Sequence, residues 1–404
     1  MIGSVVIVGG GIAGLSTAAA LRSGGFVGDI TLVDASEFPY DRPPLSKEFL
    51  AGTKRLTEIS LQPPQWYDDQ KVRLVSNSKV TALRPSIGEV ELFDGTTIPA
   101  DRVVLATGGR AARPPIPGSQ DARVHVLRTA TDAERLRAAL QPGARLLVVG
   151  AGLIGAEVAS TAVDLDCEVA LVDPLRPPLT HAVGSEIAAW LHDLHIRRGV
   201  VSVRSGVESL RATPSGIEAH LTSADRPREF DVVVLGVGMV PETTLAETAG
   251  LEVDRGIVVD RTQTTSNPAV LAVGDPARVR DGGALLPRTE HWEAAQRDGQ
   301  RAAATILGAP PPADTAPWFW TDRHHVHVEV VGDMAAAERT VLRGTVGDVK
   351  FSAFGLTGGR VVGAVAVNDS TAVRAARRLI DRGIVVDTAR LTDPATDLRQ
   401  LLLG

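Results

Sequence analysis

Two stretches of the chain carry the same pattern of glycines: VVIVGGGIAG at residues 5–14 and LLVVGAGLIGAE at residues 146–157. In both, an apolar run ends in a glycine that opens the spacing GxGxxG. The first glycine of such a turn allows a sharp bend, the second lets a phosphate approach the backbone, and the third lets a helix pack on a strand. The chain therefore contains a dinucleotide-binding turn twice.

The sequence around each turn predicts a complete βαβ unit rather than an isolated motif. The predicted strand, helix and strand cover residues 5–8, 11–25 and 29–34 in the first unit, and residues 145–150, 153–165 and 167–173 in the second. Each second strand ends in an acid, Asp34 or Asp173. A carboxylate at this position accepts hydrogen bonds from ribose hydroxyls.

Two dinucleotide folds in one chain indicate two dinucleotides. The chemically sensible pair is FAD, held tightly, and NADH or NADPH, which exchanges. Asp173 would repel a 2′-phosphate and so favours NADH over NADPH, whereas Arg176 could accept that phosphate and weakens the preference.

We therefore expect an α/β fold with two Rossmann-like three-layer nucleotide-binding domains and a small C-terminal α+β domain. The predicted FAD-binding domain has two parts, residues 1–113 and 241–316. The predicted NADH-binding domain lies between them at 114–240, and the C-terminal domain covers 317–404. Alternating apolar patterns after a Pro-rich linker and an amphipathic helix near 370–382 predict the last domain.

The bulk composition excludes several classes of protein. A net charge of −6 argues against a nucleic-acid binder. A single cysteine, Cys167, rules out an internal disulfide or a CxxC redox pair, and we interpret it as a small buried hydrophobe. No stretch reaches the ~18 apolar residues of a membrane span. The N-terminus has no basic leader and runs directly into a strand, which predicts a cytoplasmic protein.

Two further segments contain candidate site residues. DRPPLSK (41–47) is a stiff loop that carries Arg42 and Lys47, although it could be a solvated loop with an ordinary lysine. AVLAVGD (269–275) predicts a strand whose Asp275 faces a bound flavin, although an aspartate there could instead cap a helix. Glu157, directly after the second turn, could likewise be a surface charge on its helix.

In order along the chain, VVIVGGGIAG, DRPPLSK, VVLATGG, VLRTATDA, VVGAGLIGAE, TSNPAVLAVGD and PWFW resemble the NADH-dependent ferredoxin reductases. These are single-chain FAD flavoproteins of cytochrome P450 and dioxygenase systems. The resemblance covers essentially the whole chain and implies a glutathione-reductase-like arrangement. It separates the chain from the disulfide reductases, whose cysteine pair occupies the neighbourhood of the PPLSK loop.

The resemblance implies roles for individual residues. Lys47 would sit near flavin N5 and pair with Glu157, and these two are the candidate catalytic residues. The other residues implied to bind FAD are Gly9, Gly11, Ala13, Gly14, Asp34, Arg42, Val80, Thr107, Gly108, Arg128, Asp275, Trp292 and Trp320. Those implied to bind NADH are Gly150, Gly152, Leu153, Ile154, Gly155, Asp173, Gly238 and Glu290.

The chain departs from the family pattern at several histidines. Relatives often carry an arginine near His181 that binds the adenosine end of NADH. The segment TDRHHVHVE is unusually rich in histidine, and His325 and His327 would share a strand face at i, i+2 spacing. A metal site there is conceivable but has no third ligand, so we expect solvated or packed histidines, and no metal.

The implied activity is FAD-dependent NADH:ferredoxin oxidoreduction, a relay from NADH through FAD to a [2Fe–2S] ferredoxin that serves an oxygenase. The ferredoxin is expected to be acidic, and the enzyme to be a monomer or homodimer with no nucleic acid or membrane as partner. The first alternative is a flavin NADH oxidase, peroxidase or diaphorase; cysteine-based versions need a redox cysteine near the PPLSK loop, where Ser46 stands. The second is a redox-sensing flavoprotein whose association state responds to NADH.

Overall fold

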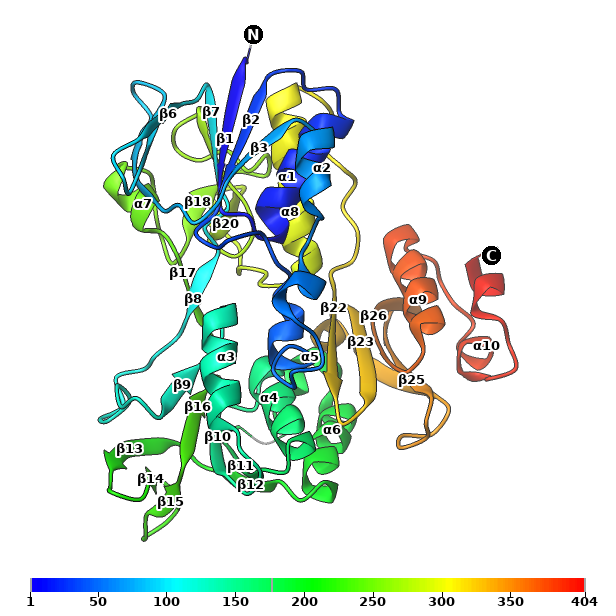
Figure 1. Ribbon diagram of the computed structural model, residues 1–404. Helices are drawn as coiled ribbons and strands as arrows, with labels where there is room; N and C mark the ends of the chain where they lie inside the picture. The colour runs from blue at the N-terminus through cyan, green and yellow to red at the C-terminus, as the bar shows by residue number, and fades with distance from the viewer. Residues whose placement is uncertain (1, 176, 403–404) are drawn as a thin grey trace. The chain divides into compact units, whose positions relative to one another are not determined.

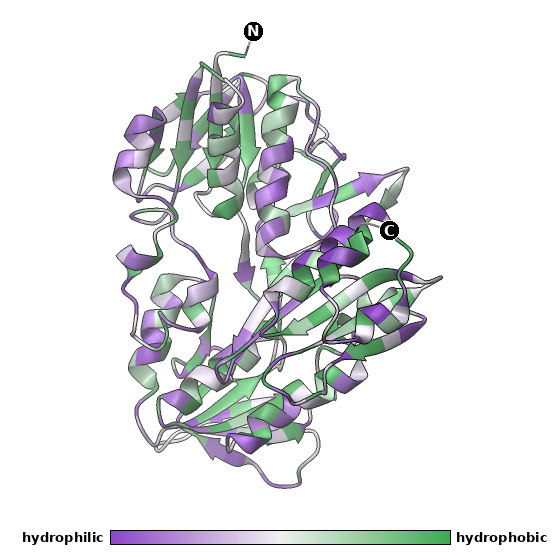
Figure 2. Cartoon of the chain, turned by 90° about the vertical axis from the view of Figure 1, so that its right-hand side faces the viewer, coloured by the Kyte–Doolittle hydropathy of each residue, from purple (hydrophilic) through white to green (hydrophobic). Residues whose placement is uncertain are grey.

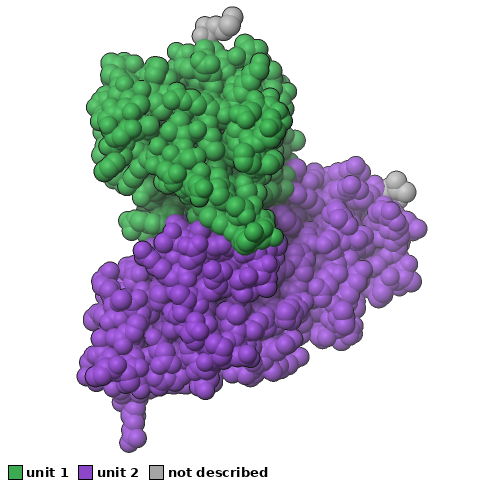
Figure 3. All heavy atoms as spheres, in the orientation of Figure 1, with its two compact units in different colours: residues 1–42, 55–110, 239–314 green, residues 43–54, 111–238, 315–404 purple. Residues whose placement is uncertain are grey.

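The computed structural model describes residues 2–175 and 177–402. By its internal contacts the chain forms two compact units. Unit 1 comprises residues 1–42, 55–110 and 239–314, and unit 2 comprises residues 43–54, 111–238 and 315–404, as coloured in Figure 3. The three domains expected from the sequence, with their boundaries, stay a prediction. Arg176, which bears on coenzyme choice, lies outside the described residues.

Unit 1 is built on a five-stranded parallel sheet in the order β19-β7-β1-β2-β3 (Figure 1). The strands β1, β7 and β19 are largely buried because they are nearly continuous apolar runs, as central parallel strands covered on both faces require. The strands are β1 (Ser4–Val8), β2 (Asp29–Val33), β3 (Val72–Val75), β7 (Arg102–Leu105) and β19 (Val270–Ala272).

Helices α1 (Ile12–Ser23) and α8 (Trp292–Leu307) pack on one another and share a hydrophobic core with this sheet. The helices approach closely because Gly299 faces α1; a Cβ there would lie 2.4 Å from the Ala13 carbonyl oxygen. The rest of unit 1 contains α2 (Pro64–Asp69), β4 (Val80–Arg84), β5 (Glu89–Leu92), β6 (Thr97–Pro99), α7 (Thr244–Thr248), β18 (Ile257–Val259), β20 (Ala277–Asp281) and β21 (Ala284–Leu285).

Unit 2 contains a second parallel sheet in the order β12-β11-β10-β16-β9. Its strands are β9 (Val124–Val126), β10 (Arg145–Val149), β11 (Glu168–Asp173), β12 (Val201–Arg204) and β16 (Val232–Leu235). Its helices are α3 (Ala130–Ala139), α4 (Leu153–Asp164), α5 (Thr180–Val183) and α6 (Ser185–Arg197). Short strands β8 (Gly109–Ala111) and β17 (Met239–Pro241) lie where the chain leaves unit 1 and returns to it.

The two parallel sheets share the order of four strands: β3-β2-β1-β7 in unit 1 matches β12-β11-β10-β16 in unit 2. The fifth strand lies at the same edge in both sheets but comes from a different place in the chain, because β19 follows β7 whereas β9 precedes β10. Each unit also has a three-stranded antiparallel sheet, β4-β5-β6 or β13-β14-β15, inserted before the strand that returns to the centre. The duplication seen in the glycine pattern therefore extends over a whole folding unit, and the expected α/β fold with two Rossmann-like domains is confirmed.

The C-terminal part of unit 2 is an antiparallel sheet in the order β22-β23-β26-β25-β24. One face packs on α9 and the other on α5 and α6, so the sheet is buried on both sides, and Figure 2 shows strands largely in the colour of hydrophobic residues. Its elements are β22 (Trp318–Arg323), β23 (Val326–Gly332), β24 (Arg339–Arg343), β25 (Phe351–Thr357), β26 (Arg360–Val367), α9 (Ser370–Arg382) and α10 (Thr388–Thr392).

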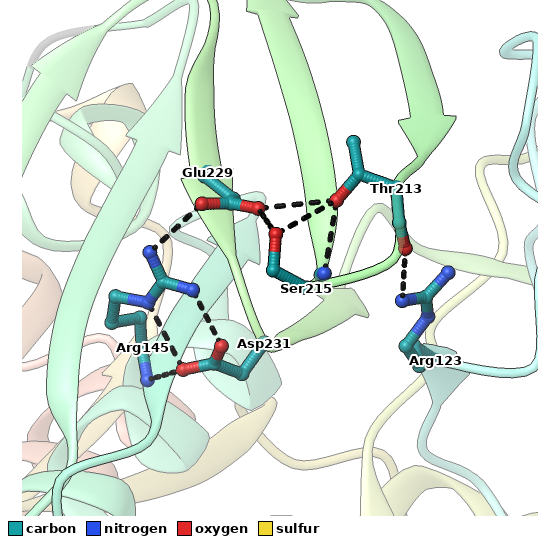
Figure 4. A network of polar contacts seen from close by, with 7 residues as sticks. Arg123, Arg145, Thr213, Ser215, Glu229 and Asp231 are labelled. Atoms are coloured by element: carbon teal, nitrogen blue, oxygen red, sulfur yellow. Dashed lines mark hydrogen bonds and ion pairs between the residues drawn. The ribbon is translucent and has the colours of Figure 1, made fainter.

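A polar network connects the second parallel sheet to the antiparallel sheet of β13 (Val207–Ala212), β14 (Ile217–Leu221) and β15 (Arg228–Phe230) (Figure 4). The Arg145 guanidinium at the start of β10 donates to Asp231 at 2.6 Å and to Glu229 at 3.3 Å. These carboxylates raise the pKa of Arg145. The network holds the edge of the nucleotide fold where the chain changes from one sheet to the other.

Most elements expected from the sequence are confirmed, including the helices near 153–165 and 370–382. Cys167 is buried as expected. The shared strand face of His325 and His327 is wrong. His325 has a φ of 63° and lies in the two-residue turn between β22 and β23, because this hairpin needs two left-handed residues and His324 and His325 occupy those positions.

The third glycine of the second fingerprint tests the close packing of helix on strand. A Cβ at Gly155 would lie 1.9 Å from the Gly150 carbonyl oxygen. We expect Gly155→Ala to lower the free energy of unfolding by about 1–3 kcal/mol, because backbone must move to admit the methyl group. Urea denaturation measures this loss. Gly152→Ala is the control, since its Cβ meets no atom within 4 Å and its φ of −67° suits alanine; equal stability of the two variants would contradict the packing argument.

Candidate functional site

The first fingerprint lies between the end of β1 and the start of α1. Gly9 adopts a φ of 107°, and a Cβ there would lie 2.3 Å from the Ala106 carbonyl oxygen. A Cβ at Gly14 would lie 2.0 Å from the Gly9 carbonyl oxygen, whereas one at Gly11 would meet nothing within 4 Å. The outer glycines therefore serve backbone packing, and the middle one leaves open space at the N-terminus of α1. No side chain caps this helix end, so its N–H groups remain for a phosphate.

The second fingerprint repeats this geometry at the start of α4. Gly150 has a φ of 98°, and its Cβ would lie 2.4 Å from the Gly236 carbonyl oxygen. Gly152 has open space around its Cβ position, and no side chain caps α4. Leu153 is half-buried and Ile154 is 43% exposed in the first turn of this helix. Both turns can accept a dinucleotide pyrophosphate for the same reason: the middle glycine leaves open space in front of a helix N-terminus that no side chain caps.

The acids that end the second strands are bonded to the fingerprint loops. Asp34 accepts from the Gly10 N–H at 2.5 Å and from the Ser36 N–H at 2.7 Å. Asp173 accepts from the Ala151 N–H at 2.8 Å and from the Leu175 N–H at 2.8 Å. Each carboxylate thus has one oxygen beside its glycine turn, where the sequence expectation for a ribose ligand requires it.

A buried carboxylate, Glu157, lies at the centre of a polar cluster in unit 2. It is 3% exposed, on the first turns of α4, and accepts from Lys47 Nζ at 3.1 Å. The hydroxyls of Ser46 and Thr321 donate to its two oxygens at 2.5 Å and 2.8 Å. The interpretations of Glu157 as a surface charge and of Lys47 as a solvated lysine are both wrong, because both side chains are largely withdrawn from water.

Three separate segments bring this cluster together. Lys47 follows the 3₁₀ turn Pro43–Ser46, in which two prolines stiffen the chain, and Thr321 lies on β22. The Thr161 hydroxyl on α4 also donates to the Ser46 carbonyl at 2.8 Å, which ties the loop to the helix. A buried anion is stable only when its oxygens are satisfied by donors. The arrangement therefore holds the Lys47 ammonium in one place.

Other predicted residues of unit 1 line the ends of strands. Thr107 and Gly108 follow β7; the Thr107 hydroxyl donates to the Glu242 carbonyl at 2.7 Å, and the Glu242 N–H to the Gly108 carbonyl at 2.9 Å. Trp292 begins α8, and its indole N–H donates to Asp41 Oδ1 at 2.8 Å.

The remaining predicted residues have these positions. Val80 is buried at the start of β4, Asp275 follows β19, and the Asp275 carbonyl accepts from Arg288 at 2.9 Å. Arg288 also pairs with Glu290 at 2.8 Å. Ala13 lies in α1, Arg42 in the loop before the 3₁₀ turn, Arg128 before α3, Gly238 after β16 and Trp320 on β22.

Sequence reasoning missed several polar residues around these positions. Ser46, Thr321 and Asp41 had no local signal, because their partners lie far away in the chain. Asp298 accepts from the Gly274 N–H at 3.2 Å, and burial raises its pKa to about 6. An acid in the middle of the otherwise small-residue core face of α8 was the one signal that could have indicated it.

Part of the histidine-rich segment is packed into the interior of unit 2. His324 Nε2 lies 2.8 Å from His195 Nδ1, and burial lowers the pKa of His195 to about 2 and that of His324 to about 4, so both rings are neutral. Next to them Arg323 is buried, and desolvation lowers its pKa to about 10. His181 lies in the short helix α5.

The comparisons with known proteins agree with this geometry. Residues 3–299 match the family model for pyridine nucleotide-disulphide oxidoreductases, and residues 318–402 match the model for a reductase C-terminal domain. Among the described residues, no helix is both long and apolar enough to span a membrane.

Curated relatives match over nearly the full length. The chain is 38% identical to the ferredoxin–NAD(+) reductase component of the anthranilate 1,2-dioxygenase system of Burkholderia cepacia, over 98% of each chain. It is 34% identical to putidaredoxin reductase of Pseudomonas putida, over 99% of this chain and 96% of that one. In the solved covalent putidaredoxin reductase–putidaredoxin complex, the reductase superposes with a TM-score of 0.91 at 33% identity, over 99% and 98% of the chains.

The doubled fold and the full-length matches define the class of the protein: an oxidoreductase of the pyridine nucleotide-disulphide oxidoreductase family, which uses FAD and NADH. Within that family the chain belongs with the ferredoxin–NAD(+) reductases of oxygenase systems. The resemblance seen in the sequence motifs is thereby confirmed.

Glu157 provides a test of the buried cluster. We expect Glu157→Ala to lower the free energy of unfolding by about 3 kcal/mol, because Lys47 then keeps a charge of low exposure without its anion. Urea titration at neutral pH measures the loss. Glu252→Gln is the control: it breaks an ion pair with Arg280 in which both side chains are well exposed, so no measurable change is expected. If the Glu157 variant were as stable as this control, Glu157 would not be the anion that stabilises the buried Lys47 charge.

Proposed function

We propose that the chain transfers electrons from NADH through bound FAD to a [2Fe–2S] ferredoxin, which in turn serves a cytochrome P450 or a Rieske-type oxygenase. The observation that carries this proposal is the pair formed by Lys47 and the buried Glu157, on the helix of the second fingerprint. A chain with one cysteine has no internal disulfide to receive the electrons, so electrons taken up by the flavin would pass directly to an acceptor outside the chain.

The residues proposed to bind FAD include the first fingerprint and the strand ends of unit 1. Backbone N–H groups of α1 would bind the pyrophosphate, and Asp34 the adenine-side ribose. Other proposed FAD residues are Ala13, Arg42, Lys47, Val80, Thr107, Gly108, Arg128, Asp275, Trp292 and Trp320. The second fingerprint, with Leu153, Ile154, Asp173, Gly238 and Glu290, is proposed to bind NADH.

When bound, FAD accepts a hydride from NADH and releases the electrons singly. The contribution of the protein is positioning and charge. Lys47 would place its positive charge near flavin N5, where negative charge develops as the flavin is reduced. Glu157 would hold the Lys47 ammonium at that position. The hydroxyls of Ser46 and Thr321 donate to the two oxygens of Glu157. They thereby hold the carboxylate in the orientation in which it binds Lys47.

The proposed partner is an acidic ferredoxin. Although the chain has a net charge of −6, Arg374, Arg378 and Arg382 lie exposed at i, i+4 spacing on α9. A row of arginines on one helix face attracts an acidic protein and speeds its association. The relay is proposed to operate in the cytoplasm, where NADH is supplied, with the enzyme as a monomer or homodimer.

A flavin NADH oxidase is the main alternative to this relay. Cysteine-based oxidases and peroxidases need a redox cysteine near the PPLSK loop, and Ser46 in that loop donates to Glu157 and offers no thiol. We therefore favour the ferredoxin relay.

The coenzyme preference can be measured at the flavin band by stopped-flow reduction. We expect NADH to reduce the enzyme at least ~10-fold faster than NADPH at equal subsaturating concentrations, because Asp173 repels the 2′-phosphate. Asp173→Asn should narrow the difference between the rates of flavin reduction by NADH and by NADPH. Gly152→Ala should weaken NADH binding without loss of stability, and Gly11→Ala should instead weaken FAD retention. Equal rates with both coenzymes would contradict the role of Asp173.

The final acceptor is tested with cytochrome c as reporter. We expect an added acidic [2Fe–2S] ferredoxin to accelerate cytochrome c reduction by at least ~10-fold at low salt, and the acceleration to fall as ionic strength rises. A variant with Arg374, Arg378 and Arg382 changed to Gln should keep NADH-dependent flavin reduction and lose much of the salt dependence. No acceleration, with oxygen consumption equal to NADH loss, would establish the oxidase instead.

A further inference from the structure

The histidine-rich hairpin contains a polar network that the proposed function does not use. The antiparallel register of β22 and β23 pairs Trp320 with Glu329 and Asp322 with His327. Cross-strand partners lie on the same face of a sheet, so these four side chains share one face with Trp318. The opposite face of β22 carries Thr321, which donates to Glu157.

Glu329 is the acceptor at the centre of this network. It is 7% exposed, and its Oε2 accepts from the Trp318 indole N–H at 3.0 Å. Its Oε1 accepts from the Ser370 hydroxyl at the start of α9 and lies 3.2 Å from His327 Nε2. Three donors from three elements thus hold one buried carboxylate in a single orientation.

His327 lies between two acids. Its Nδ1 is 2.6 Å from Asp322 on β22, and its Nε2 faces Glu329. The hydrogen bonds to these carboxylates raise the pKa of His327 to about 9, so both ring nitrogens carry protons at neutral pH. The other neighbouring elements contribute the Asn368 side chain, which accepts from the His327 N–H, and Asp369, which pairs with Lys350 at 3.3 Å.

The network ends on a pair of indoles. The rings of Trp318 and Trp320 stack with centroids 5.0 Å apart and planes 25° apart. Because Glu329 fixes the indole N–H of Trp318, it also fixes the plane against which Trp320 lies. Trp320 is one of the residues proposed above to bind FAD, and we take its ring to lie against the flavin.

We propose that Glu329 and His327 are positioning residues for the flavin chemistry, which set the orientation of Trp320 through its stacking on Trp318. This inference rests on the proposed role of Trp320 in the ferredoxin relay. It assigns a function to the histidine that departs from the family pattern. The network orients a ring and takes no part in the proton or electron balance of the reaction.

The test compares FAD-loaded variants Glu329→Gln and His327→Gln with the wild type. Stacked indoles give a paired circular dichroism signal, and an indole stacked on flavin quenches flavin fluorescence. We expect both variants to lose the paired signal, to gain flavin fluorescence and to slow ferredoxin reduction by about tenfold, because a ring held less firmly is misplaced relative to the reacting atoms. The control is His325→Asn, in the same hairpin turn and 73% exposed, which should leave all three unchanged.

A double-mutant cycle decides whether Glu329 acts through Trp318. In a Trp318→Phe background the indole N–H is absent, so Glu329→Gln should add no further change in flavin fluorescence or rate. Ser370→Ala removes one donor to Glu329 and serves as a milder variant if Glu329→Gln does not fold. Full additivity of the two changes, or an unaltered indole signal in Glu329→Gln and Ser370→Ala, would overturn the proposal.

The pH dependence provides an independent arm. Because the folded pKa of His327 is raised, its stabilising contribution is fully present below pH ~6.5 and is lost as the pH rises through about 9. We expect the paired indole signal of the wild type to fall over that interval and to be flat in His327→Gln. A flat wild-type signal would contradict the proposal. This readout needs no ferredoxin, so a wild type that reduces no ferredoxin would defeat the proposed function and leave the indole result to be judged alone.

Discussion

The contact between a helix start and a strand end, without a Cβ between them, is the constraint on which both nucleotide folds depend. At Gly14 and Gly155 the carbonyl of the first fingerprint glycine occupies the place where a side chain would begin. This approach brings the uncapped N-termini of α1 and α4 to the carboxyl edges of their sheets. An aspartate then ties each loop to the end of the second strand. The same few backbone contacts, made twice, produce two anion sites in one chain.

The two copies differ in the residues that come after the third glycine. In α1 the residues from Leu15 to Leu21 carry no charge, and the helix packs against α8. In α4 the corresponding stretch contains Glu157, and the helix packs against the PPLSK loop and β22 instead. A buried acid in a helix costs free energy unless donors surround it, so its presence requires the donors Ser46, Lys47 and Thr321. Duplication thus supplied the frame, and one acid distinguishes the second copy.

The fold was predictable from the sequence to the extent that its signals are local. Glycine spacing, apolar runs and terminal acids lie within about 30 residues of one another, and the elements predicted from them are confirmed. The residues missed are those with distant partners. Thr321 is 164 residues from Glu157, and Asp41 is 251 residues from Trp292. His325 was placed on a strand because alternation alone cannot tell a strand end from a two-residue turn.

Strand β22 of the C-terminal part does more than cover a hydrophobic core, because it supplies residues to two polar clusters of unit 2. Alternation sends Thr321 to one face, where it completes the shell of Glu157, and Trp320 to the other, where it stacks on Trp318. Two adjacent residues of β22 therefore make contacts on opposite faces of the sheet: Thr321 with Glu157 and Trp320 with Trp318. A shift of this strand by one residue would exchange its faces and break both sets of contacts at once. The hairpin turn at His324 and His325 prevents that shift, because His324 is anchored through its N–H on Ser160 and its ring on His195. His324 thus helps to hold the register of the strand that carries Thr321 and Trp320.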